Sequence, residues 1–347
     1  MKHDWPVGET WRASLFLGVL AVAAPAWGDA RAIVVEARTQ DPARLDGWRA
    51  TLGRGGASER AAAAFAIGQL GMAWEPPSEA VRARAEAALV DALAGEKDAT
   101  VRDRIVEGLG KVGGRAALAP LRGALDGAER TRAAVALAEL AKNRALTDGA
   151  ARARLEQLLG DGNAETRWAA ALALLRYRDP ASHAALRGCA GDAAVHVRAT
   201  CAKALADVGG DEDAAALAPL LADRDDRVAA EAARTLTKLL VKCRDSGCRT
   251  LRALQNGKLP WRPSVVQAVT FEHPRGIAVA ALLRAAWEAE PKASALDQRT
   301  RAILGCKLAM AHDRAVGRID LLSSCAASER ERGVWMAGRS PTSAGRS

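Results

Sequence analysis

Residues 161–175 read DGNAETRWAAALALL, residues 192–209 read DAAVHVRATCAKALADVG, and residues 223–239 read DRDDRVAAEAARTLTKL. Each stretch opens on aspartate and runs into an alanine-rich helix; the first two carry Thr-Arg or Val-Arg between these parts. Related copies are DATVRDRIVEGLGKVG from Asp98, DGAERTRAAVALAEL from Asp126 and SERAAAAFAIGQLG from Ser58. Self-similarity of this kind indicates an array of structural repeats.

The repeat arginines set the period of the array. Arg102, Arg132, Arg167 and Arg198 are 30, 35 and 31 residues apart, a length that suits two helices and their turns. Second apolar helices are expected between these copies, at residues 79–95, 117–125, 151–159 and 216–222. Each unit is therefore predicted to be helix, turn, helix, with an acidic residue before the helix to accept bonds from its free N–H groups.

The apolar pattern requires these helical pairs to stack. Val197, Cys201, Ala204, Leu205 and Val208 form a stripe that a single helical hairpin could not bury. The composition agrees, because 49% of residues are hydrophobic but only 4% are aromatic, so small aliphatic side chains carry the core. We predict an all-α fold, a right-handed α-solenoid of stacked helical hairpins.

Over about residues 58–240 the chain resembles HEAT-repeat proteins, in particular the short-repeat class whose helices read VRxxAAxALGxLG and which is named after bilin lyases. The resemblance implies structural, repeat-stacking roles and no catalysis for Asp98, Arg102, Arg132, Asp161, Arg167, Asp192 and Arg198. Two copies depart from the pattern: Asp126 is displaced from its arginine, and Ala229 stands where arginine is expected.

The N-terminus has the pattern of an export signal. Residues 15–24, LFLGVLAVAA, follow Lys2 and Arg12 and precede Ala26-Trp27-Gly28, which suits cleavage before Asp29. We predict a signal peptide over 1–28, a cap or linker over 29–57, a HEAT-repeat solenoid over 58–242, degenerate helical repeats over 243–326 and a disordered tail over 327–347. A periplasmic or secreted location follows, with no transmembrane segment after cleavage.

All six cysteines lie in the second half of the chain. Export permits disulfides, and two pairings are considered, Cys243 with Cys248 and Cys306 with Cys325. A zinc site is the alternative, but there is no CxxC and no histidine within four residues of these cysteines. We expect no metal site.

Chemical functions find little support in the sequence. The HEAT-like iron hydroxylases need His-Glu pairs, and none occurs; no GxSxG motif or phosphate loop is present either. The net charge of +9 raises nucleic-acid binding as an alternative, but export argues against it. No catalytic, cofactor or metal residue is predicted.

The expected function is a non-catalytic scaffold in the cell envelope that binds another protein or peptide. An alternative hypothesis is that the chain is the repeat region of a secreted peptidyl-prolyl isomerase-type protein that lacks its catalytic domain. Exported bacterial HEAT-repeat proteins that resemble this chain sometimes carry an isomerase domain after the repeats. The partner itself is not readable from the sequence.

Overall fold

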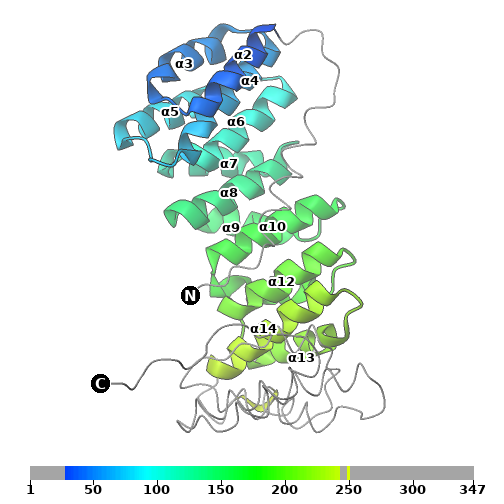
Figure 1. Ribbon diagram of the computed structural model, residues 1–347. Coiled ribbons are helices and arrows are strands. Elements are labelled where there is room, and N and C mark those ends of the chain that lie inside the picture. Colours follow the sequence, from blue (N-terminus) through cyan, green and yellow to red (C-terminus); the bar gives the residue numbers. More distant parts are fainter. Residues whose placement is uncertain (1–27, 243–247, 251–347) are drawn as a thin grey trace, which may run out of the picture. The chain divides into compact units, whose positions relative to one another are not determined.

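The computed structural model describes residues 28–242 and 248–250 (Figure 1). This part of the chain folds into α-helices and short 3-10 turns and contains no strand. None of its helices is long and apolar enough to cross a membrane. The predicted all-α solenoid is confirmed, and the chain divides between Ala124 and Leu125 into two compact units.

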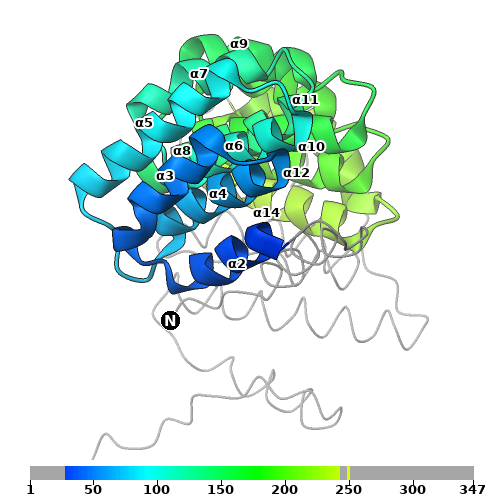
Figure 2. The ribbon, with the colours of Figure 1, turned by 90° about the horizontal axis from the view of Figure 1, so that it is seen from above.

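The first unit is built around the packing of α4 along α6. The helices α2 and α3 pack against α4, and α5 packs against α6 (Figure 2). The described helices of this unit are α2 (Gly28–Glu36), α3 (Leu45–Arg54), α4 (Ala57–Gln69), α5 (Glu79–Gly95), α6 (Ala99–Val112) and α7 (Leu118–Ala124).

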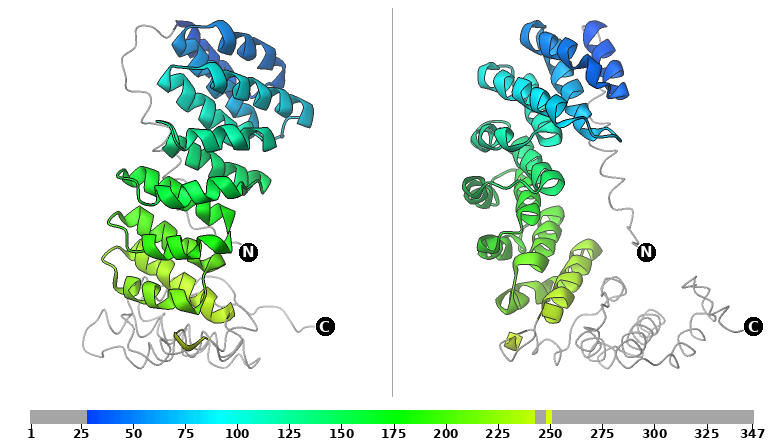
Figure 3. Two further views of the ribbon diagram at one scale, coloured as in Figure 1. Left: turned by 180° about the vertical axis from the view of Figure 1, so that it is seen from behind. Right: turned by 90° about the vertical axis from the view of Figure 1, so that its left-hand side faces the viewer.

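The second unit consists of two rows of helices (Figure 3). The first row is α8, α10, α12 and α14, each packed on the next, and the second row lies behind it, with α9 against α10 and α11 against α12. The bounds are α8 (Arg130–Arg144), α9 (Gly149–Leu158), α10 (Ala164–Tyr177), α11 (His183–Cys189), α12 (Val195–Val208), α13 (Ala214–Leu217) and α14 (Asp226–Lys242).

Small side chains let the helices of the first unit approach closely. A Cβ atom added at Gly68 of α4 would lie 2.8 Å from the Cα of Gly108 in α6. Alanine fills much of the remaining core in both units, with Ala63, Ala64 and Ala170 fully buried. The alanine-rich, aromatic-poor composition is therefore explained by close helix packing.

Helix ends follow the turn residues of the sequence. Gly113 and Gly209 are the C-cap residues of α6 and α12. A Cβ at Gly113 would lie 2.3 Å from the carbonyl oxygen of Leu109, so a larger residue does not fit there. Asp98 caps α6 by accepting hydrogen bonds from the N–H groups of Thr100 and Val101.

One predicted helix is shorter than expected. Residues 216–222 were expected to form an apolar helix, but α13 ends at Leu217 and the chain continues as a 3-10 turn over Ala218–Ala222. Pro219 lies at the start of this turn and has no N–H to donate, which removes one of the bonds an α-helix needs. The turn still buries Leu220 and Leu221 against α14.

The segment 29–57 contains two of the helices that pack on α4. Trp48 of α3 is buried, and its indole N–H donates to Glu36 Oε2 of α2 at 2.9 Å. The glycine cluster at residues 53–56 spans the end of α3 and the start of α4. Residues 1–27, 243–247 and 251–347, with the expected signal peptide, C-terminal repeats and tail, lie outside the described part.

Candidate functional site

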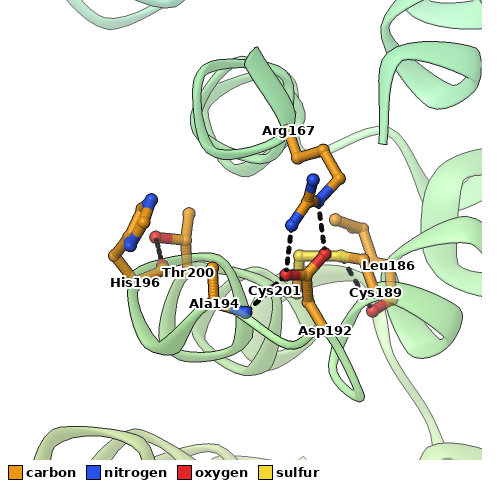
Figure 4. Close-up of a disulfide and its surroundings, with 8 residues drawn as sticks. All are labelled: Arg167, Leu186, Cys189, Asp192, Ala194, His196, Thr200 and Cys201. Carbon is orange, nitrogen blue, oxygen red and sulfur yellow. Dashed lines mark hydrogen bonds and ion pairs between the residues drawn. A yellow bond between two sulfur atoms is a disulfide. The ribbon is translucent and has the colours of Figure 1, made fainter. Parts of the chain in front are cut away.

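An arginine in each regular repeat holds the next repeat. Arg167 at the start of α10 donates through Nε and Nη2 to the two carboxylate oxygens of Asp192, at 2.7 and 2.9 Å (Figure 4). Its Nη1 donates to the carbonyl oxygen of Asp161, six residues before it, at 2.9 Å. One side chain thus fixes its own helix start and the loop that follows in the array.

The same geometry recurs one repeat later. Arg198 donates to both carboxylate oxygens of Asp223, at 2.8 and 3.1 Å, and to the carbonyl oxygen of Asp192 at 2.8 Å. The acids Asp161, Asp192 and Asp223 are 31 residues apart, and the first of them is bound by Arg130 at 2.8 Å. We call this series of three arginines and three aspartates the arginine ladder.

The first unit contains a rung of the same design. Arg60 donates to Glu96 through Nε and Nη2, at 2.7 and 3.0 Å. Arg102, six residues after Glu96, donates to the Glu96 carbonyl oxygen at 3.0 Å. Glu96 therefore occupies the position that aspartate holds in the second unit.

The acids of these rungs have pKa values below the ordinary value. The hydrogen bond from Arg60 is the main cause of the lowered pKa of Glu96, about 2. Arg130 is the main cause for Asp161. In Asp192 and Asp223 burial acts to raise the pKa, but the hydrogen bonds from arginine and from a backbone N–H outweigh it. All four are ionised at neutral pH and form ionic pairs with arginine.

The structure separates two roles that the sequence pattern had merged. The acid of the rung lies six residues before the repeat arginine, and the helix cap lies two residues after that acid. In the first unit these positions are Glu96 and Asp98; in the second they are Asp161 and Asn163. Asp192 likewise does not cap α12, because Ala194 is the N-cap residue there.

The copy from Asp126 is aligned differently from the expectation. Asp126 precedes Arg132 by six residues, the spacing of the regular copies, so it is not displaced; Asp98 is the residue that stands out of line. Asp126 pairs with Arg154 at 2.7 Å. The carboxylate of Asp161 is held by Arg130 at Nε, two residues before Arg132. Ala229, where the next arginine would stand, is fully buried.

A disulfide joins Cys189 at the end of α11 to Cys201 in α12, with the Cα atoms 5.9 Å apart (Figure 4). Sequence reasoning did not find this pair. It links two helices of one hairpin, beside the rung of Arg167 and Asp192. Cys248 is also disulfide-bonded; Cys243, Cys306 and Cys325 lie outside the described residues.

A second set of polar contacts connects neighbouring repeats through the other row of helices. In the second unit, Arg187 of α11 pairs with the fully buried Asp213 at 2.7 Å, and Ser182 donates to Glu156 at 2.7 Å. In the first unit, Glu86 of α5 accepts the N–H groups of Gly114 and Ala117 at 2.8 and 2.7 Å. Both rows are therefore fixed by charged groups.

Two histidines lie in the described part, each beside one carboxylate. His183 is 3.8 Å from Glu212 and His196 is 3.5 Å from Glu165. Within residues 28–242 and 248–250, no three His, Cys, Asp or Glu side chains gather closely enough to hold a metal ion. The charged groups of the rungs are instead paired with one another in a geometry that fixes repeat spacing.

Comparison with known proteins agrees with this architecture. Residues 151–237 match a family model described as HEAT repeats, whereas comparison with curated proteins gave no match. Similar solved structures include the following two, both with TM-scores below 0.5. An engineered protein of the Northeast Structural Genomics Consortium has a TM-score of 0.48 and 18% identity, covering 87% of this chain and 91% of that chain. The complex of CpcE and CpcF of phycocyanin lyase from Nostoc sp. PCC7120 has a TM-score of 0.42 and 19% identity, covering 75% and 93%. By this match, residues 151–237 contain HEAT repeats.

Proposed function

We propose that the chain is a non-catalytic scaffold of the cell envelope whose stacked repeats hold another protein. The observation that carries this proposal is the arginine ladder. The charged residues at fixed repeat positions, Arg167 and Arg198 with their aspartates, are bonded to neighbouring repeats. Their roles are in stacking, which leaves the solvent-facing side chains of the helices as the surface for binding.

The disulfide supports the location in the cell envelope. Disulfides form and persist in oxidising compartments and are rare in the cytosol, where thiols are kept reduced. Cys189 and Cys201 are buried and bonded, and the apolar segment at residues 15–24 has the pattern of an export signal. These are two independent reasons for the same compartment.

The partner test uses the full chain as bait in an envelope extract of its own source. Crosslinking followed by mass spectrometry is expected to recover a specific protein, with crosslinks on the helices of the first row in the second unit. A control bait carries Arg167→Ala and Arg198→Ala, which weakens repeat stacking and should reduce recovery. Recovery of nucleic acid alone, or of no protein, would reject the scaffold proposal.

The location test measures the thiols directly. Free thiols are blocked in whole cells before lysis, and the state of Cys189 and Cys201 is read by mass spectrometry in each cell fraction. We expect a disulfide-bonded, N-terminally processed chain in the envelope fraction. A reduced chain in the cytosolic fraction would contradict the envelope location while leaving the binding proposal open to its own test.

A further inference from the structure

Three neighbouring helices of the second unit expose equivalent stripes of residues. The residues of each stripe lie seven, eleven and fifteen positions after the aspartate of that repeat. They are partly or fully exposed, whereas the residues between them are mostly buried. A spacing of four residues keeps them on one side of a helix. We call the nine residues the stripe face: Trp168, Leu172 and Arg176 on α10; Ala199, Lys203 and Asp207 on α12; and Ala230, Arg234 and Lys238 on α14.

Contacts between the helices show that the stripes run side by side. At the amino-terminal end, His196 of α12 lies 3.5 Å from Glu165 of α10. At the other end, Arg178 lies 3.2 Å from Asp207, and Lys242 of α14 donates to the carbonyl oxygen of Ala206 at 2.7 Å. The three helices are therefore parallel, and their exposed stripes form one continuous surface.

The chemistry of the stripe face changes along the helices. Its first third, Trp168, Ala199 and Ala230, is apolar, and Leu172 continues the apolar surface along α10. Tryptophan is a frequent anchor of protein interfaces because one side chain provides a large apolar area.

The rest of the stripe face is basic. Arg176, Lys203 and Lys238 are partly or fully exposed, and within the described residues none of them has an ion-pair partner. Arg234 pairs with Glu231 at 2.8 Å, and Asp207 is the acidic member of the face. Charged side chains without partners on one surface attract a ligand of opposite charge.

We propose that the stripe face binds an acidic protein segment in which apolar residues lie beside Asp and Glu. This inference rests on the proposed scaffold function and names its site and the chemistry of its partner. Apolar side chains of the segment pack on Trp168 and Leu172, and its carboxylates pair with Arg176, Lys203 and Lys238. Leu172 and the alanines of the face suit aliphatic side chains, which a protein segment provides and a nucleic acid lacks, and this favours a protein partner.

The test measures binding of a fluorescein-labelled peptide of alternating Glu and Leu to the full chain by fluorescence anisotropy. The test variant combines Arg176→Glu, Lys203→Glu and Lys238→Glu. The matched control combines Arg54→Glu, Arg115→Glu and Arg224→Glu, which are exposed positions off the stripe face with the same change in net charge. We expect the test variant to lose about tenfold or more in affinity and the control to lose much less.

A second variant examines the apolar end. Trp168→Ala is expected to weaken peptide binding severalfold, and circular dichroism shows whether each variant remains folded. Equal loss in the test and control variants, or no peptide binding by the wild-type chain, would overturn the inference. Tighter binding of a single-stranded oligonucleotide or of phosphatidylglycerol vesicles through the same residues would also overturn it. If peptide binding fails but the envelope extract still yields a crosslinked partner, only the stripe face is rejected and the scaffold function stands.

Discussion

At the scale of single residues, one side chain carries the connection between repeats. Arg167 and Arg198 each reach forward to an aspartate of the next repeat and backward to a carbonyl oxygen of their own loop. The planar guanidinium group suits this double role because its donors point in fixed directions. Lysine has the same charge but cannot make both sets of bonds at once.

Removing one such arginine should weaken the fold measurably. Arg167→Ala leaves the Asp192 carboxylate without its ionic partner, and we expect the free energy of unfolding to fall by about 1–3 kcal/mol. Arg176→Ala, on the exposed side of the same helix, should change it by about 0.5 kcal/mol or less. Urea denaturation followed by circular dichroism measures both, and equal losses would contradict the role of the arginine ladder.

Acid should destabilise the first unit through Glu96. Its pKa is about 2 in the folded chain, against an ordinary value of 4.5. The unfolded chain therefore binds a proton at Glu96 more tightly than the folded chain does. The stability that ionised Glu96 contributes is complete above about pH 4.5 and is lost as the pH falls toward 2. Urea denaturation at about pH 7 and about pH 3 should show a smaller loss of stability in Glu96→Gln than in the wild type. The same pH dependence in both chains would contradict this assignment.

The sequence predicted the repeat arginines but not every partner. Arg102, Arg167 and Arg198 recur visibly, so their place at the helix starts could be found. Glu96 was missed because Asp98 also precedes the helix and matches the better-known capping pattern. The helix-cap residue and the acid of the rung are two positions apart in the sequence, and only the direction of their side chains distinguishes them.

At the scale of helices, the approach of α4 to α6 depends on glycine at the point of contact. Gly108→Ala would place a methyl group 3.1 Å from the carbonyl oxygen of Ala64 and 3.0 Å from a methyl carbon of Leu89. We expect a loss of about 1–3 kcal/mol in the free energy of unfolding, since an overpacked core must shift or strain.

Gly123→Ala provides the matched comparison within the same unit. Gly123 lies in α7, and nothing lies within 4 Å of a Cβ added there. Alanine favours helix over glycine by up to about 1 kcal/mol, so this change should be neutral or stabilising. Thermal unfolding of the two variants gives the comparison; a similar loss of stability in both would contradict the role of close contact at Gly108.

Helix positions could be predicted well from apolar spacing, whereas the disulfide could not. The predicted helix over 79–95 coincides with α5. The pair Cys189 and Cys201 depends on the turn between α11 and α12, which brings their Cα atoms to 5.9 Å. The sequence separation of 12 residues gives no such distance, because it is compatible with many turn geometries.

At the scale of the whole molecule, each repeat contacts only its neighbours, so a local change in stability is expected to affect only the adjacent repeats. Replacing the disulfide by Cys189→Ser and Cys201→Ser should lower the free energy of unfolding by about 2–4 kcal/mol. Hydrogen exchange read by mass spectrometry is expected to show faster exchange in α11 and α12, with α4 and α6 unchanged. Uniform acceleration along the chain would show that the repeats unfold as one block instead.

The regular spacing of the arginine ladder has a consequence for how such a chain can lengthen or shorten. The backbone from Asp161 to the residue before Asp192 has the same length as that from Asp192 to the residue before Asp223. Each such segment brings one aspartate to receive the preceding arginine and one arginine to reach the following aspartate. Duplication or deletion of that whole segment keeps each arginine matched to an aspartate, whereas gain or loss of a single codon between Arg167 and Asp192 changes the spacing of that one pair and leaves the later pairs unchanged.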